Sequence, residues 1–336
     1  MSQMYDAVIL VSFGGPESRE EVIPFLENVL RGRNVPYERM MEVAEHYYHF
    51  GGVSPINEQN RALIAALAQT LKERGPNLPI YWGNRNWHPM LADTLRQMSE
   101  DGVKRALALV TSAFSSYSGC RQYQDDIARA RRSLGDRAPR VDKLRVFYNH
   151  PEFIGANIEI LRDALASVPE ERHSTTEVLF SAHSIPQSMA DSCDYVSQLN
   201  EAARLIVGGV GWKNWRLVFQ SRSGPPSQPW LEPDVSDCAA ELKQEGKTDI
   251  VVCPIGFLSD HMEVIFDLDT ELKENCQKIG LNLVRAATVG VHPLFIGMIR
   301  ELILERMNTG AMKRYLGTMG PRPDFCPIDC CPGPRR

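Results

Sequence analysis

The chain has 336 residues, of which 43% are hydrophobic and 24% charged, and its formal net charge is −5 at pH 7. This is an ordinary globular composition, with length for two domains or one large α/β unit. Nucleic-acid binding is not favoured, because the longest basic cluster is RARR at 129–132. The N-terminal stretch MSQMYDAVILVSFGG has neither the basic segment of a signal peptide nor an apolar run long enough to span a membrane. We therefore expect a cytoplasmic protein with reduced cysteines.

Short runs rich in Val, Ile and Leu alternate along the chain with longer segments of helical spacing, such as 56–74. Apolar runs of this length indicate parallel strands buried on both faces. The alternation favours an α/β fold of two similar Rossmann-like, doubly wound halves, each with a four-stranded parallel sheet. The predicted strands are 6–12, 79–84, 105–112, 144–149, 177–182, 216–221, 249–256 and 281–287.

The eight predicted strands divide into two sets of four, which sets the expected domain organisation. We expect an N-terminal half over residues 1–160 and a C-terminal half over residues 161–315. A cysteine-containing tail follows over residues 316–336. In doubly wound folds ligands bind beyond the carboxyl ends of the strands, so functional residues are expected in the peptides that follow the strands.

One such peptide reads VLFSAHSIP and places His183 directly after a predicted buried strand. A lone histidine is more often a hydrogen-bonded structural residue. The position at the carboxyl end of a strand favours a functional role, because a neutral imidazole there can bind a metal or accept a proton.

A second strand end, VVCPIGFLSDHMEVIFDLDTEL, leads into a row of carboxylates in which Glu263, Asp267 and Glu271 recur at every fourth position. In an α-helix each carboxylate is rotated about 40° from the last, and a π-type bulge would bring them into line. The alternative is a solvated acidic helix face. Basic partners are missing at the i+4 positions, and the row begins beside a strand end, so we favour a ladder of oxygen ligands.

Two further loops combine cations with aromatic or hydroxyl side chains. YWGNRNWHP contains Arg85, and SSYSGCRQY contains Arg121 and Tyr123. Either loop suits a flat ligand that carries anionic groups, although each is a weak signal by itself. Walker A and GxGxxG motifs are missing from the sequence, so nucleotide binding has no support.

The tail FCPIDCCPGPRR places Cys326, Cys330 and Cys331 within six residues. Clustered cysteines in a reducing compartment indicate a metal site before disulfides. Their spacing alone fits zinc and an iron–sulfur cluster equally well. We interpret the scattered cysteines as small buried hydrophobic residues; they are Cys193, Cys238, Cys253 and Cys276.

Taken in order, these motifs closely resemble the ferrochelatases, which insert ferrous iron into a porphyrin to complete a haem. The resemblance covers nearly the whole chain. It implies two Rossmann-like halves with a porphyrin cleft between them. The motifs that carry it are FGGPES, GGVSPINEQNR, GNRNWHP, SAHSIP, QSRSGPPSQPWLEPD and FLSDHMEVIFDLD.

The resemblance implies that His183 and Glu263 face the porphyrin centre from opposite walls. His183 would accept pyrrole protons or act as the first ligand to Fe²⁺, and both roles stay open at this point. Asp267 and Glu271 resemble carboxylates on a π-helical stretch that is proposed to carry metal inward or protons outward.

Further porphyrin contacts are also implied by the resemblance. Phe13 occupies a position that is tyrosine in one bacterial branch, where it can ligate the product iron, and phenylalanine cannot do so. Arg85 resembles an arginine on the proposed iron route. The residues that resemble porphyrin-contacting polar groups are His46, Tyr47, Ser54 and Tyr123, and those that match the surroundings of Glu263 are Phe257, Asp260 and His261.

Some ferrochelatases carry a [2Fe–2S] cluster held by cysteines of a C-terminal extension and one cysteine of the body. A two-iron cluster commonly takes four thiolates. The resemblance therefore predicts a cluster bound by Cys120, Cys326, Cys330 and Cys331, with a structural or redox-sensing role.

The substrate is expected to be coproporphyrin III, with protoporphyrin IX next. The polar segment 25–40 carries Arg31 and Arg33, and cations there would suit the four propionates of coproporphyrin. A haem acceptor or the preceding pathway enzyme would be a transient partner. The alternatives are a chelatase that loads cobalt or nickel into another tetrapyrrole, and a non-catalytic haem or porphyrin carrier.

Overall fold

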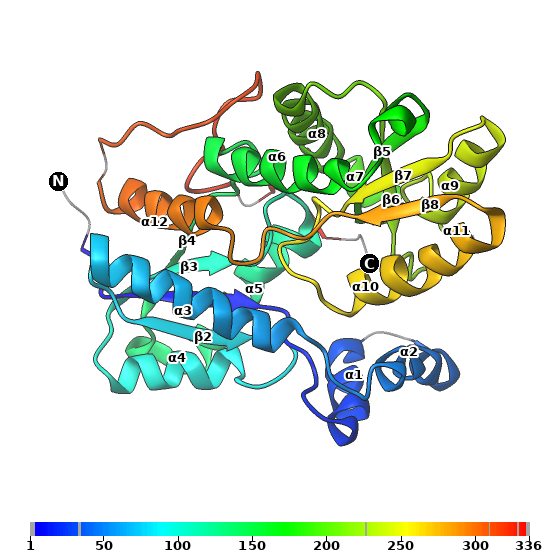
Figure 1. Ribbon diagram of the computed structural model, residues 1–336. Coiled ribbons are helices and arrows are strands. Elements are labelled where there is room, and N and C mark those ends of the chain that lie inside the picture. The colour runs from blue at the N-terminus through cyan, green and yellow to red at the C-terminus, as the bar shows by residue number, and fades with distance from the viewer. Residues whose placement is uncertain (1–3, 33–34, 226, 309, 328, 334–336) are drawn as a thin grey trace. The chain divides into compact units, whose positions relative to one another are not determined.

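The structure is a computed structural model that describes residues 4–32, 35–225, 227–308, 310–327 and 329–333 (Figure 1). It contains two four-stranded parallel sheets with the strand orders β2-β1-β3-β4 and β6-β5-β7-β8. The expected α/β class is therefore confirmed. The strands are β1 (Ala7–Ser12), β2 (Ile80–Asn84), β3 (Arg105–Val110), β4 (Arg140–Lys143), β5 (Thr176–His183), β6 (Trp215–Gln220), β7 (Asp249–Cys253) and β8 (Asn282–Arg285).

The chain forms two compact units that are not continuous in sequence. The first unit comprises Met1–Thr111, Gln122–Leu144 and Ile299–Ala311. The second unit comprises Ser112–Arg121, Arg145–Met298 and Met312–Arg336. The main boundary lies at residues 144 and 145 and not at the predicted residue 160, and both Cys120 and the cysteine tail belong to the second unit.

In the first unit, β1 lies between β2 and β3 and is buried along its whole length. Ile9 and Val11 pack on one face with α4 and α5. Ser12 lies on the other face, where its hydroxyl accepts a hydrogen bond of 3.0 Å from Asn60 of α3. The helices are η1 (Arg19–Glu21), α1 (Val22–Leu30), α2 (Tyr37–His49), α3 (Ile56–Arg74), α4 (Leu91–Glu100), α5 (Gln122–Arg132) and η3 (Gly135–Arg137).

The predicted strand at 144–149 is wrong. The strand lies just before it, at β4, and residues 144–149 form a buried irregular segment. The strand was missed because its sequence, RVDK, is charged. Asp142 is nevertheless buried there, since Arg105 lies 2.6 Å from its carboxylate and the Tyr5 hydroxyl donates a hydrogen bond of 3.0 Å to it.

In the second unit, β5 lies between β6 and β7. Leu179 of β5 packs with Val218 and Val252 against α9, α10 and α11, whereas α6 contacts β7 and β8 and packs with α8. Side chains alternate along a strand, so His183 shares the face of Leu179. The helices are η2 (Tyr117–Arg121), α6 (Pro151–Ala166), η4 (Glu170–Thr175), α7 (Gln187–Ala190), α8 (Tyr195–Val210), α9 (Val235–Gln244), α10 (Met262–Phe266), η5 (Asp267–Leu272) and α11 (Lys273–Ile279), while α12 (Pro293–Met307) divides between the units.

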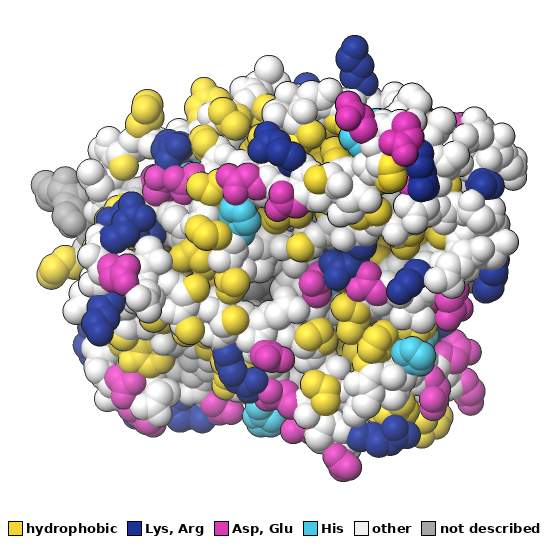
Figure 2. Space-filling model, in the orientation of Figure 1, with side chains coloured by type: hydrophobic (Ala, Val, Ile, Leu, Met, Phe, Trp, Pro, Cys, Tyr) yellow, Lys and Arg dark blue, Asp and Glu magenta, His cyan; other side chains and the backbone are white. Residues whose placement is uncertain are grey.

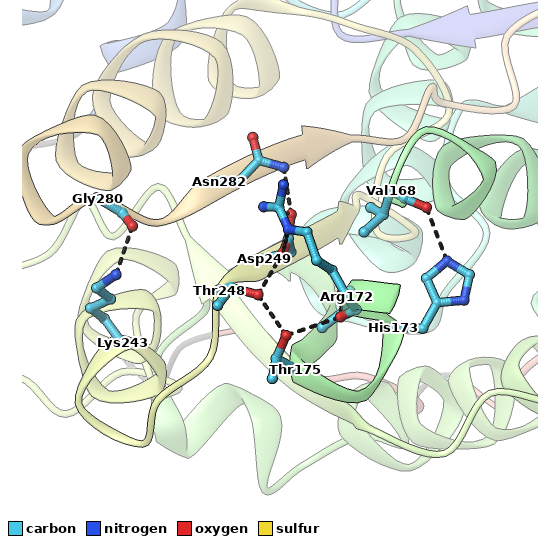
Figure 3. Close-up of polar contacts among 10 residues, drawn as sticks. Val168, Arg172, His173, Thr175, Lys243, Thr248, Asp249, Gly280 and Asn282 are labelled. Atoms are coloured by element: carbon cyan, nitrogen blue, oxygen red, sulfur yellow. Dashed lines mark hydrogen bonds and ion pairs between the residues drawn. The ribbon is translucent and has the colours of Figure 1, made fainter. Parts of the chain in front are cut away.

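A buried carboxylate fixes the amino-terminal edge of this second sheet (Figure 3). Asp249 opens β7 and is fully buried. It accepts two hydrogen bonds from the Arg172 guanidinium, one of 2.7 Å from the Thr248 hydroxyl and one of 2.6 Å from the Asn282 amide. A buried charge that is paired and fully hydrogen-bonded stabilises the fold, so we assign this cluster a structural role.

Charged side chains of both signs are interspersed on the face drawn in Figure 2. The sequence is similarly balanced, with 37 Lys and Arg against 42 Asp and Glu. Across the described ranges, none of the helices is both long enough and apolar enough to cross a membrane.

Candidate active site

His183 is the last residue of β5 and lies at the carboxyl-terminal edge of the second sheet. Its Nδ1 contacts the carbonyl oxygen of Ser184, and its Nε2 lies 3.4 Å from Oε1 of Glu263. The hydroxyl of Tyr195 donates a hydrogen bond of 3.1 Å to the His183 carbonyl oxygen. These contacts direct Nε2 toward Glu263 and leave about a third of the histidine side chain exposed.

Glu263 lies in the first turn of α10, and its side chain is 48% exposed. His261 caps this helix, because its Nδ1 accepts a hydrogen bond of 3.2 Å from the backbone N–H of Glu263. The ring of Phe257 packs edge-on against His261, with the ring centroids 5.0 Å apart. The structure thus brings His183, Phe257, His261 and Glu263 together. His183 and Glu263 contact each other within the second unit, so the expectation that they face each other from opposite walls is wrong.

The two central groups control each other's protonation. Burial lowers the pKa of His183, but the charge of Glu263 and the hydrogen bond to it outweigh burial and raise this pKa to about 9. Burial likewise opposes ionisation of Glu263, yet His183 holds its pKa well below the usual value. At neutral pH the metal-free pair is therefore an imidazolium and a carboxylate, and His183 must lose its proton before it accepts another or binds a cation.

The predicted π-type segment is confirmed: η5 runs directly between α10 and α11. Asp267 opens η5, and its Oδ2 accepts hydrogen bonds from the Ser221 hydroxyl and, at 3.3 Å, from the Gln220 amide. The same amide nitrogen donates at 2.8 Å to the backbone carbonyl of Glu263. The end of β6 therefore fixes both the acidic row and the helix that carries it.

The acidic row runs from the half-exposed Glu263 to the exposed Glu271. Burial, together with the negative charges of Glu263 and Glu271, raises the pKa of Asp267 to about 7, against the lowering effect of its Ser221 hydrogen bond. Burial and the charge of Asp234 raise the pKa of Glu271. Asp267 can therefore take up and release a proton near neutral pH.

Three residues of this site were missed as site residues in the sequence. Gln220 and Ser221 hold Asp267, and Ser221 adopts the left-handed region with φ of 60°, which is uncommon for a residue other than glycine. Arg285, at the end of β8, contacts Asp260 at 2.9 Å and Asp269 at 2.6 Å. All three lie at carboxyl ends of strands. The rule that ligands bind beyond these ends in doubly wound folds could therefore have identified them.

In the first unit, Phe13, Arg85 and Tyr123 come together. The Arg85 guanidinium lies 4.5 Å from the Tyr123 ring centroid and 5.9 Å from that of Phe13. It is buried and forms an ion pair of 2.5 Å with Asp126. Because Asp126 neutralises this charge, the geometry favours a brace behind the two rings over a free cation on an ion route.

The other candidates of the first unit lie on α1, on α2 and in the loop before α3. Arg31 is exposed at the end of α1 and contacts Asn28. On α2, the Tyr47 ring packs edge-on against Phe25, with the centroids 5.7 Å apart, while burial and the charge of Arg39 lower the pKa of His46. Ser54 is buried. Arg33 lies outside the described residues.

The cysteines of the second unit include a group of free thiols in contact. The Cys330 and Cys331 sulfurs are 3.5 Å apart, and Cys331 is hydrogen-bonded to Cys193. Cys120 is buried in η2. Soft thiolate donors suit an iron–sulfur cluster or zinc, so the residue types fit, although these contacts do not define four ligands.

The ferrochelatase family model matches residues 5–307 of the chain. The chain belongs to the ferrochelatase family. Among its relatives, the ferrochelatase of Rhodopirellula baltica is 57% identical over 328 residues, which cover 97% of this chain and 93% of the relative. The coproporphyrin III ferrochelatase of Streptomyces griseus is 49% identical over 350 residues, which cover 98% and 93%.

A solved structure, SirB from Bacillus subtilis with Fe³⁺, resembles this ferrochelatase-family chain with a TM-score of 0.59. The alignment covers 90% of this chain and 96% of SirB, at 14% identity. At that identity the likeness supports the fold alone.

Proposed function

We propose that the chain is a ferrochelatase, an enzyme that inserts Fe²⁺ into a porphyrin with release of two protons in haem biosynthesis. The observation that carries the proposal is the His183–Glu263 pair at the head of an acidic row that ends at an exposed carboxylate. A carrier would need no such row, whereas an inserting enzyme must move a cation inward and protons outward.

The protonation of this pair supports a sequence of events. Fe²⁺ accepts both imidazole and carboxylate ligands, so Glu263 attracts the ion along the row from Glu271 and Asp267. The approaching cation displaces the His183 proton, which leaves outward along the acidic row through Asp267. Neutral His183 then accepts one pyrrole proton as the metal enters the ring, passes it to solvent along the acidic row, and accepts the second pyrrole proton in the same way. His183 can act either as proton acceptor or as first ligand to Fe²⁺ in this sequence of events, because both roles require that it first lose its proton.

We further propose that the first-unit candidates contact the macrocycle. Phe13 is exposed and offers aromatic surface, whereas Tyr123 is buried and packs against Arg85. Phe13 cannot ligate the product iron, so an axial ligand from that position is excluded. Asp126 neutralises Arg85, which therefore holds the rings in place. The remaining proposed contacts are Arg31, His46, Tyr47, Ser54, Phe257 and His261.

We propose coproporphyrin III as the preferred porphyrin. The exposed Arg31 suits a substrate with four propionates, and several relatives near 50% identity bear the name coproporphyrin III ferrochelatase. Anaerobic initial rates of Fe²⁺ insertion with coproporphyrin III and protoporphyrin IX, measured side by side, test this. A preference for protoporphyrin would overturn the substrate assignment. Activity with neither porphyrin would overturn the proposal that the chain is a ferrochelatase.

We also propose a [2Fe–2S] cluster at the cysteine tail, with Cys120, Cys326, Cys330 and Cys331 as its predicted ligands. When bound, the cluster would supply a cross-link between the tail and the body and a redox-sensitive centre. The proposal is supported by the contact between two tail thiols and by the burial of Cys120. Replacing Cys330 by Ser should abolish the visible absorption of the cluster and lower the melting temperature, and an unchanged spectrum would exclude Cys330 as a ligand.

The setting of the enzyme is part of the same proposal. Free thiols that bind a cluster need a reducing compartment, which supports a cytoplasmic location. The product is a poorly soluble haem, so a haem acceptor or the preceding pathway enzyme is the expected transient partner. Pull-down from a cytoplasmic extract with and without porphyrin would test both points.

A further inference from the structure

The tail is bound to the second unit next to Cys193. The guanidinium of Arg322 forms an ion pair of 2.7 Å with Asp194, the residue that follows Cys193. Slightly upstream in the tail, the backbone N–H groups of Thr318 and Met319 donate hydrogen bonds of 3.0 and 3.2 Å to the buried carboxylate of Glu201. These contacts hold the part of the tail that precedes its cysteines beside the start of α8.

The thiols meet at the far end of the same tail. Cys331 is buried, with its backbone in the left-handed region at φ of 54°, and it is hydrogen-bonded to Cys193. Its sulfur also lies 3.5 Å from that of Cys330. A left-handed conformation at a residue other than glycine is strained, so packing must hold the Cys331 thiol in place.

The tail also packs on the segment that carries Cys120. A Cβ atom built on Gly333 would lie only 2.8 Å from the ring of Tyr117, which opens η2. Cys120 is in the same π-helical turn. Three chain segments of one compact unit, namely η2, the peptide before α8 and the tail, therefore bring thiols to one place.

We propose that Cys193 is a ligand of the cluster, so that the site contains five thiols for four ligand positions. The inference rests on the proposed cluster. Two thiolates on one tetrahedral metal, each about 2.3 Å away, lie about 3.8 Å apart. The 3.5 Å contact between the sulfurs of Cys331 and Cys330 is of this kind and is present before any metal binds. Cys193 is hydrogen-bonded to the same Cys331 thiol from another segment of the chain. Cys193 thus holds one of the four ligand positions in place of one of the cysteines that the sequence indicates.

A purely structural role for Cys193 is the alternative. Its thiol lies 3.3 Å from the carbonyl oxygen of Met189 and 3.7 Å from that of Ala190, and a weak donor to two carbonyls could serve packing alone. In that case a serine, which also donates a hydrogen bond, would replace Cys193 with no effect on metal content. This difference makes Cys193→Ser the informative variant.

The experiment is anaerobic reconstitution of the full chain with ferrous iron and sulfide, followed by measurement of iron, acid-labile sulfide and visible absorption. We would compare wild type, Cys193→Ser, Cys326→Ser and the control Cys276→Ser, whose thiol is buried in the hydrophobic core of the same unit. We expect Cys193→Ser to lose at least half of the iron and sulfide, and Cys276→Ser to load like wild type. Full loading of Cys193→Ser would overturn the inference.

Differential alkylation of the wild-type protein provides a measurement that no folding defect can confuse. We expect iodoacetamide to label the partly exposed Cys193 after the metal has been removed with a chelator, and to leave it unlabelled in the loaded protein. Equal labelling in both states would overturn the assignment. If wild type takes up no iron and sulfide, the proposed cluster fails as well, whereas loading without protection of Cys193 overturns only this inference.

Discussion

Two carboxylate sites lie at opposite edges of the same four-stranded sheet. At the amino-terminal edge, Asp249 is fully buried and saturated with hydrogen bonds from Arg172, Thr248 and Asn282. At the carboxyl-terminal edge, Glu263 is half exposed and shares one contact with His183, while Asp267 titrates near neutral pH. A carboxylate that is completely paired contributes stability and cannot change its charge. One that is incompletely paired can bind a cation or a proton.

The comparison is tested most strongly at Glu263. Replacing Glu263 by Gln should lower the rate of Fe²⁺ insertion by about 100- to 10,000-fold, the range for loss of a group acting directly in proton transfer. The melting temperature should change little, because the side chain is half exposed. The matched control is Glu274→Gln on the exposed face of α11, which should retain activity. Equal rates for the two variants would refute the mechanism.

The opposite pattern is expected at Asp249. Replacing it by Asn leaves Arg172 without its carboxylate and should lower the free energy of unfolding by about 3 kcal/mol. The insertion rate, measured well below the melting temperature, should stay close to that of wild type. Urea denaturation gives the stability, with the exposed Asp93→Asn as control. A large loss of activity without loss of stability would contradict the division between the two edges.

The titration of Asp267 should make the free energy of unfolding depend on pH. Its pKa rises from 3.8 to about 7 on folding, so the native state binds this proton more tightly than the unfolded state. The stabilisation from this proton is present in full below about pH 4 and is lost as the pH rises through 7. Relative to Asp267→Asn, wild type should therefore lose about 2 kcal/mol between pH 4 and 8, less than the full shift would give because the site is partly solvated. Parallel pH profiles of the two proteins would show that Asp267 does not titrate there.

The smallest effect is expected at Arg285, which links Asp260 to Asp269. Arg285→Ala should lower the free energy of unfolding by about 1 kcal/mol and reduce turnover about tenfold, because the π-helical segment loses its brace. If its role is to position the row, Arg285→Lys should recover part of the turnover, and KM for iron should change less than kcat. Recovery of stability without recovery of turnover would indicate a structural role only.

The family resemblance implied the π-type segment. By itself, the sequence determined seven of the eight strands that the structure describes, the acidic row and the position of His183 after a strand. These features are local, because a buried parallel strand needs a continuous apolar run and a helix repeats its contacts every few residues. Strand β4 was not predicted, because its burial depends on Arg105 and Tyr5, which are remote in sequence.

Only the tertiary structure decided which partners each functional group has. Asp126 neutralises Arg85, Ser221 and Gln220 hold Asp267, and Cys193 meets Cys331 across more than a hundred residues of chain. The charge of a group is set by the atoms within a few ångströms of it, and these come from distant segments. The spacing of residues in the sequence therefore identified the groups that carry the chemistry, and the fold determined their protonation and their ligands.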